Sequence, residues 1–159
     1  MNKMIGILPV LSLLSACGAA DGELKEGNWK NTMTITKFEL PGAPAAMAQQ
    51  AKSVLGKKQS TDICLNAAQA KAGVRDFSSA MQEGDCKMTD FKQGSGKMSG
   101  NMVCKGSAMG DTTMAMDGTY TPEKVAMTLS GEISQKSLPG GKATIGMSIT
   151  SDRAGDCKG

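Results

Sequence analysis

Five cysteines carry the most distinctive chemistry in this chain of 159 residues. Cys17 follows an apolar stretch near the start, whereas Cys64, Cys86, Cys104 and Cys157 are distributed over the remainder. A thiol can be acylated or oxidised to a disulfide, and a thiolate can bind a metal. The chain contains no histidine, which excludes Ser-His-Asp and Cys-His nucleophile systems and every metal site that requires an imidazole ligand.

The surroundings of Cys17 predict a lipid attachment site. Residues 1–16 have the organisation of a signal peptide: a lysine near the start and then about ten uncharged, mostly apolar residues, half the length that a bilayer-spanning helix needs. Leu14-Ser15-Ala16-Cys17 resembles the bacterial lipobox, in which a peptidase cleaves before a cysteine that has received a diacylglyceryl group. The alternative is ordinary secretion with cleavage near Ala16 or Ala20.

Lipidation of Cys17 would tether the mature protein to a membrane. Three acyl chains, each gaining about 0.8 kcal/mol per buried methylene, hold a protein almost irreversibly. Gly18, rather than an aspartate, follows the cysteine, and by resemblance to the enterobacterial sorting rule this indicates the outer membrane. We therefore expect residues 17–26 to be a lipidated N-terminus and tether, and residues 27–159 to form a single all-β domain.

The other four cysteines predict two disulfides. An even number of cysteines in an exported chain indicates oxidation, and no pair has the Cys-x-x-Cys spacing of a metal site. Gly94-Ser95-Gly96 predicts a three-residue hairpin loop, and the register of that hairpin places Cys86 directly opposite Cys104, near the separation that a disulfide accepts. Cys86–Cys104 is therefore the first predicted bridge, which leaves Cys64–Cys157 as the second.

Thirteen methionines suggest a different chemistry. Thioethers bind Cu(I), and Met114 and Met116 share one face of a predicted strand, while the predicted hairpin places Met88 opposite Met102. Unbranched methionine also fills the core of a sheet that has few aromatic rings, and only 3% of the residues are aromatic. We expect no cofactor, and these four methionines are the weak candidates for a metal site.

Carboxylates could support hydrolysis, because two acids can act together as general acid and general base. Asp85, Asp90, Asp111 and Asp117 lie in or near the predicted hairpins, but their spacing selects no pair. The net charge of +3 is too small to indicate a nucleic-acid partner. We therefore expect a protein that is not an enzyme and does not bind nucleic acid.

Hydrophobic periodicity predicts the elements that position these residues. Residues 27–40 alternate as a half-buried strand with Trp29 as a core anchor, residues 44–56 have helical spacing, and residues 59–65 return as a strand. Asn66 can cap a short helix that ends before Gly73.

Beyond Cys86 the sequence predicts a run of hairpins. Turn signals recur about every ten residues, and apolar residues alternate in the segments between them. Three sets share a face: Met114 and Met116; Val125, Met127 and Leu129; and Ala143, Ile145, Met147 and Ile149. The expected fold is mainly β, a curved antiparallel β-sheet meander of six to eight strands with one or two short helices, held by two disulfides.

Several short segments together resemble a known family. They are Gly27-Asn28-Trp29, Cys64-Leu65, Gly84-Asp85-Cys86, the hairpin return at Cys104, and Arg153-Ala154-Gly155-Asp156-Cys157. Their order is similar to that of the proteobacterial family named domain of unknown function 3617. Two positions depart from the pattern: Asn66 stands where many relatives have a threonine-like residue, and the terminal basic stretch is reduced to Arg153. The resemblance implies an exported, methionine-rich protein of a Gram-negative cell envelope, and it carries no reaction, ligand or catalytic residue.

Together these features favour a non-enzymatic, lipid-anchored protein that faces the periplasm from the outer membrane. Its curved sheet is expected to bind an apolar molecule or a protein partner, because an incompletely covered apolar face is a binding surface. Two alternatives are left open. Methionine-mediated Cu(I) sequestration in the periplasm requires three or more sulfur atoms to converge, and a carboxylate enzyme requires two acids at one cleft.

Overall fold

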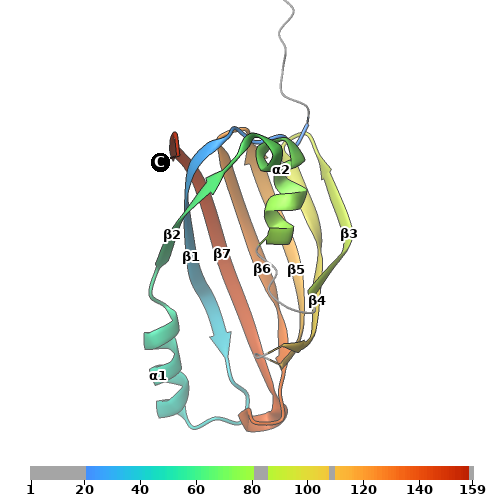
Figure 1. Ribbon diagram of the computed structural model, residues 1–159. Coiled ribbons are helices and arrows are strands. Elements are labelled where there is room, and N and C mark those ends of the chain that lie inside the picture. The colour runs from blue at the N-terminus through green and yellow to red at the C-terminus, as the bar shows by residue number, and fades with distance from the viewer. Residues whose placement is uncertain (1–20, 81–85, 108–109, 158–159) are drawn as a thin grey trace, which may run out of the picture.

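The computed structural model describes residues 21–80, 86–107 and 110–157. The predicted leader (residues 1–16), the predicted lipidation site Cys17 and Asp85 lie outside the described residues. Seven antiparallel strands form one open sheet in the order β2-β1-β7-β6-β5-β4-β3 (Figure 1). The elements are β1 (Gly27–Glu39), α1 (Ala45–Leu55), β2 (Gln59–Leu65), α2 (Ala67–Ala80), β3 (Cys86–Gly94), β4 (Lys97–Ser107), β5 (Gly110–Thr121), β6 (Lys124–Ser134), the 3-10 turn η1 (Pro139–Gly141) and β7 (Lys142–Gly155).

The last five strands form the predicted meander, and the first two join it at its far side. Strands β3 to β7 pair consecutively, β1 pairs with β7, and β2 pairs with β1 at the edge. Helix α1 lies in the connection from β1 to β2, and helix α2 connects β2 to β3, the two edge strands. The mainly β fold with two short helices, and a strand number within the predicted range, are confirmed.

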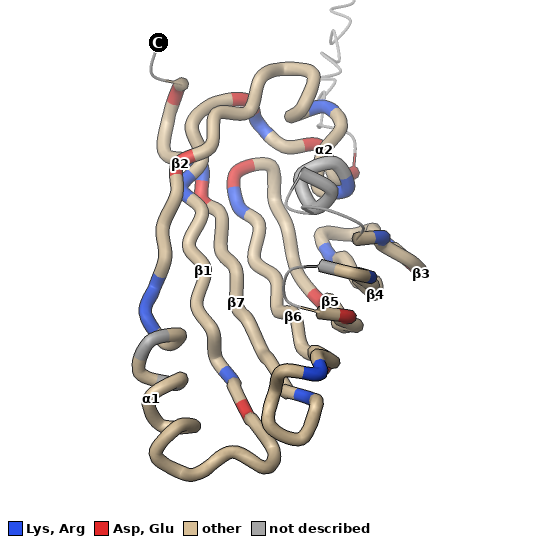
Figure 2. The backbone as a smooth tube through the Cα atoms, turned by 60° about the horizontal axis from the view of Figure 1, so that its bottom comes forward, with Lys and Arg blue, Asp and Glu red and all other residues tan. Residues whose placement is uncertain are grey.

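The sheet is curved, and α2 lies on its concave side between the two edges (Figure 2). The three alternating sets predicted from the sequence share this concave face, where all are buried except Met147, which is half-buried. The residues that alternate with these apolar side chains in β5, β6 and β7 face outward and are mostly threonine, serine, aspartate and glutamate. Burial of the apolar set is the main source of stability for such a sheet. The buried cluster includes Trp29, Val74, Met98, Met114, Met116, Val125, Met127, Leu129, Ile145 and Ile149.

Two glycines in mid-strand allow neighbouring strands to approach on this curved surface. A Cβ atom at Gly118 would lie 2.7 Å from both the carbonyl oxygen of Ala126 and the terminal methyl of Met98. A Cβ atom at Gly131 would lie 2.0 Å from the carbonyl oxygen of Thr113. No larger residue fits at either position without moving the backbone, which is how glycine marks a close approach of another backbone in a sheet.

Helix α2 covers one end of the concave face. Asn66 starts the helix with a capping box: its Oδ1 accepts from the Gln69 amide and its own amide donates to Gln69 Oε1, each at 3.0 Å. The predicted stop at Gly73 is only half right, because a φ of 75° interrupts the helix there but the helix resumes and continues to Ala80. The guanidinium of Arg75 lies 5.6 Å from the centre of the Phe91 ring on β3, so α2 also contacts the opposite edge of the sheet.

The β3–β4 hairpin has a different turn from the predicted one. The expected three-residue loop Gly94-Ser95-Gly96 is wrong, because Gly94 pairs with Lys97 and only two residues remain between the strands. Ser95 and Gly96 have φ angles of 50° and 73°, as a tight hairpin turn requires. A bulge earlier in β3 shifts the register back by one residue, so the two deviations cancel.

Both disulfides join the same cysteine pairs that the sequence predicted. Cys86 on β3 lies opposite Cys104 on β4, with a Cα–Cα distance of 3.9 Å. Cys64 on β2 is bonded to Cys157 just beyond β7, with a Cα–Cα distance of 5.5 Å. Because β1 lies between β2 and β7, the second bridge spans three adjacent strands.

Candidate functional site

A shallow pocket of mixed polar and apolar lining lies at the end of the molecule that holds α1, which we call the α1 end. The ladder between β2 and β1 stops at the pair Met33–Gln59, so the second half of β1 has a strand neighbour only on the β7 side. Helix α1 lies beside this free edge (Figure 1). The space between them, the α1 pocket, has a volume of about 290 Å³. It is lined by Ile35, Thr36, Lys37, Phe38, Glu39, Leu55 and Gly56.

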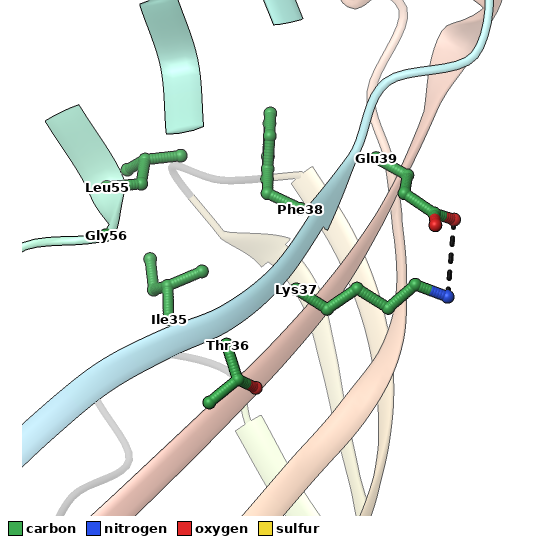
Figure 3. A pocket seen from close by; sticks show the side chains of 7 residues that line it. All are labelled: Ile35, Thr36, Lys37, Phe38, Glu39, Leu55 and Gly56. Carbon is green, nitrogen blue, oxygen red and sulfur yellow. Dashed lines mark ion pairs between the residues drawn. The ribbon is translucent and has the colours of Figure 1, made fainter. Parts of the chain in front are cut away.

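The residues that line the pocket are apolar on one side of β1 and charged on the other. Figure 3 shows Ile35 and Phe38 pointing toward Leu55 of α1, whereas Lys37 and Glu39 point to the other side of β1 and form an ion pair at 3.3 Å. A bulge between Ile35 and Lys37 separates these two orientations. Met47, two turns before Leu55 on α1, is 49% exposed and is the large apolar side chain most open to solvent in the described part of the chain.

Three of the four candidate methionines form a row across the concave face. Met88 lies directly opposite Met102, and Met102 lies directly opposite Met114, so three adjacent strands each contribute one thioether. Cβ atoms of directly opposed residues are about 4.5 to 5.5 Å apart, within reach of long side chains. Met116 lies two residues further along β5, opposite Gly100, and is outside this methionine row. Met114 is buried, and Met88 and Met102 are half-buried.

The candidate acids are not brought together in the described structure. Asp111 is engaged by the Gly106 amide at 3.0 Å and the Lys105 ammonium at 3.4 Å, and these contacts lower its pKa. Asp90 accepts from the side chain of Asn101, and Asp117 is exposed on the outer face. Within the described ranges no group of three or more Cys, Asp or Glu side chains is arranged to hold a metal ion.

The residues just before β1 are fixed to the end of the sheet that holds α2, which we call the α2 end. Asp21 Oδ1 accepts from the Tyr120 hydroxyl at 2.5 Å, and Oδ2 accepts from the Ser95 amide at 3.0 Å. The Asp21 carbonyl oxygen accepts from the Gln93 side chain at 3.2 Å. Residues Asp21–Glu26, which the sequence assigns to the tether, are therefore an ordered segment, and we call them the N-terminal clamp.

Helix α2 holds the next part of the clamp. The Val74 amide donates to the Gly22 carbonyl oxygen at 3.0 Å, and the Leu24 amide donates to the Ala70 carbonyl oxygen at 2.9 Å. A Cβ atom at Gly73 would lie 2.1 Å from the Gly22 oxygen, so the glycine that interrupts α2 also makes room for the clamp. The kink and the clamp are thus parts of one packing arrangement.

The last residues of the clamp connect to the β5–β6 turn, β7 and the core. Lys25 forms an ion pair with Glu123 at 2.7 Å, and its carbonyl oxygen accepts from the Trp29 indole at 3.0 Å. The Glu26 carbonyl oxygen accepts from Arg153 Nε at 2.7 Å. That bond joins the residues before β1 to β7, and the guanidinium of Arg153 also pairs with Asp156 at 2.8 Å.

The clamp keeps a carboxylate beside a neutral phenol at neutral pH. The hydrogen bond from Tyr120, followed by that from the Ser95 amide, lowers the pKa of Asp21 below its usual 3.8. Burial, followed by the hydrogen bond to Asp21, raises the pKa of Tyr120 above its usual 10.0. Sequence reasoning missed this contact, although the single tyrosine of an aromatic-poor chain was a signal for it.

The fold and its bridges define a class of protein, a disulfide-linked antiparallel β-sheet domain with a helix across part of its concave face. The chain belongs to the family described as a protein of unknown function, DUF3617, whose sequence profile matches residues 24–157. The resemblance seen in the sequence is thereby confirmed. No curated protein and no solved structure shows significant similarity to the chain. Among the helices of the described residues, none has the length and apolar character needed to cross a bilayer.

Proposed function

We propose that this protein is a lipid-anchored interaction protein of the Gram-negative cell envelope, attached to the outer membrane through Cys17, and that its α1 pocket binds an apolar side chain of a partner protein. The lipobox-like sequence before Cys17 and the exported family support the anchor. The binding role is carried by one observation: Ile35, Phe38 and Leu55 converge at the α1 end, where Met47 is also exposed.

The shape of the pocket favours a protein partner over an enclosed small molecule. The centre of the concave face is filled by its own side chains, since Met114, Met116 and Leu129 are all at least nine-tenths buried. The space at the α1 end is open, and about 290 Å³ lies just below the range of roughly 300 to 1,000 Å³ that small-molecule sites occupy. Apolar side chains with charged residues close by are common in protein–protein contacts.

The partner can be tested by photo-cross-linking in cells. A benzophenone-bearing amino acid in place of Met47 should give one discrete adduct with another protein, whereas the same replacement at Ser130, exposed on the outer face of β6, should give none. Phe38→Ala should lower the adduct yield about tenfold, since loss of one aromatic contact at an interface costs about 1.4 kcal/mol or more. Thr113→Ala, on the outer face of β5, is the matched control and should leave the yield unchanged.

Other outcomes would contradict this role for the α1 pocket. Adducts of equal yield from positions 47 and 130 would indicate random collision. Adducts only with lipid, or only with a second copy of this chain, would reject a separate partner protein. Circular dichroism of Phe38→Ala should show an unchanged sheet, so that a lost adduct reports on the pocket.

The methionine row supports a second candidate function, binding of Cu(I). Soft thioether sulfurs select Cu(I), and three of them on adjacent strands at one level can point to a common centre. Met88 and Met102 are half-buried, so the row has a solvent-accessible side near β3.

An anaerobic titration with Cu(I) in the presence of a competing chelator tests this candidate. The full mature protein should bind a single equivalent, and Met88→Leu/Met102→Leu/Met114→Leu should abolish that binding while keeping the core volume. Met33→Leu/Met147→Leu, on the same face but outside the row, is the control and should bind as the unmodified protein does. Binding without a defined stoichiometry, or equal binding by both variants, would reject the site.

A further inference from the structure

We infer that the N-terminal clamp orients the whole domain on the membrane, with the α2 end against the bilayer and the α1 pocket directed away from it. This inference rests on the proposed lipidation of Cys17. It adds the direction from which a partner must approach, and it follows from the contacts of Asp21–Glu26 together with the length of chain between the anchor and those contacts.

The clamp fixes the place where the tether leaves the domain. Asp21 is bonded by groups from β5 and from the β3–β4 turn, and the following residues are bonded by α2. The β5–β6 turn adds a further contact, because the Lys25 amide donates to the Pro122 carbonyl oxygen at 2.7 Å. All of these elements lie at the α2 end (Figure 1). These contacts come from β5, the β3–β4 turn, α2 and the β5–β6 turn, so together they attach the clamp to the α2 end of the domain.

Few residues separate the proposed anchor from the clamp, so the end of the domain that holds the clamp must lie near the bilayer. Four backbone steps separate Cys17 from Asp21, and they span at most about 14 Å when fully extended. Strand β7 has 14 residues and runs from the α1 end to the α2 end. At about 3.4 Å per residue it is roughly 45 Å long. With the acyl chains in the bilayer, the α2 end must stay close to the headgroups, and an upright domain places the α1 pocket some tens of ångströms away.

The polar side chains on the outer face of the sheet do not favour an orientation in which the domain lies flat on the bilayer. Most outward residues of β5 and β6 are exposed and polar, and polar groups gain nothing from contact with the acyl region. These residues include Thr113, Asp117 and Thr119 on β5, and Thr128, Ser130, Glu132 and Ser134 on β6. Charges of both signs surround the α2 end, including the pairs Lys25–Glu123 and Lys124–Asp152, which suits a headgroup layer (Figure 2). An upright orientation is therefore expected on average.

Energy transfer from the protein to the membrane tests the orientation. The full lipidated protein is reconstituted in phosphatidylethanolamine/phosphatidylglycerol vesicles that contain a headgroup-labelled acceptor. With its cysteines in two disulfides and one thioether, the protein accepts a dye at a single introduced cysteine, either Thr121→Cys in the β5–β6 turn or Ser137→Cys before η1; both positions are exposed. Transfer should be several-fold stronger from position 121 than from position 137.

A longer tether provides the matched control. Insertion of twelve glycine and serine residues between Ala19 and Ala20 should bring the two transfer efficiencies close together, because the clamp then no longer lies near the anchor. Equal transfer from both positions in the natural chain would overturn the orientation while the anchor stands, provided that mass spectrometry finds the diacylglyceryl group on Cys17. Absence of that group from Cys17 would instead overturn the proposed anchor and, with it, this inference.

Discussion

Replacing Trp29 by alanine should lower the free energy of unfolding by about 3 to 5 kcal/mol, the usual cost of removing a large buried aromatic side chain. Trp29 has no solvent exposure and belongs to the cluster that contains Val74 of α2 and Val125 of β6. Its indole nitrogen also donates to the Lys25 carbonyl oxygen at 3.0 Å. The substitution therefore leaves a cavity where β1, α2 and the clamp meet.

Guanidinium unfolding followed by far-ultraviolet circular dichroism measures this loss, because the variant has no tryptophan left to report by fluorescence. Trp29→Phe is the informative comparison: it retains most of the apolar surface but gives up the indole hydrogen bond, so its loss should be smaller by about half or more. A loss below about 1 kcal/mol in Trp29→Ala would mean that this position is not the centre of the core.

Removing the Cys64–Cys157 bridge should destabilise the protein more than removing Cys86–Cys104. The two bridges have sequence separations of 93 and 18 residues. In the chain-entropy treatment, loops of these lengths correspond to about 4.7 and about 3.2 kcal/mol, because the longer loop restricts the unfolded chain more. The positions of the two bridges in the sheet favour the same ranking. The long bridge spans β2, β1 and β7, whereas the short one joins two strands that are already neighbours.

The comparison requires double substitutions to alanine, Cys64→Ala/Cys157→Ala and Cys86→Ala/Cys104→Ala. Alanine avoids a new hydroxyl at Cys104, which is 5% exposed, and a hydroxyl buried there without a partner would add its own penalty. Guanidinium unfolding of both variants and of the reduced parent protein gives the three free energies. An equal or larger loss from the short bridge would show that native packing, and not chain entropy, decides the contribution of each bridge.

Local patterns in the sequence predicted the elements well, because each depends on residues that are close along the chain. Alternation identified the buried faces of β5, β6 and β7, and Asn66 identified the start of α2 through its capping bonds. The cysteine pairing was also predicted correctly, although the predicted three-residue turn at Gly94-Ser95-Gly96 was wrong. The register there depends on a bulge in β3, and a bulge leaves little trace in a pattern of alternating residues.

These local patterns could not predict contacts between segments that are far apart in the sequence. Nothing in the alternation of residues 27–39 indicates that β1 pairs with β7. The α1 pocket exists because β2 ends early and a helix lies beside the remaining edge of β1. The contact between Asp21 and Tyr120 joins residues 99 positions apart. Such contacts depend on the completed sheet, since their partners meet only after every intervening strand is in place.

The sequence by itself determined the chemistry of this protein: a cysteine that follows a lipobox-like sequence, four further cysteines, many methionines and no histidine. It also determined which side of each central strand is apolar, since side chains alternate with a period of two in any strand. The tertiary structure alone decided which strands are neighbours, which apolar residues remain open at the α1 end, and where the chain leaves the domain. The physical reason is that burial selects a face locally, whereas strand order and surface shape are set by how all seven strands share one core.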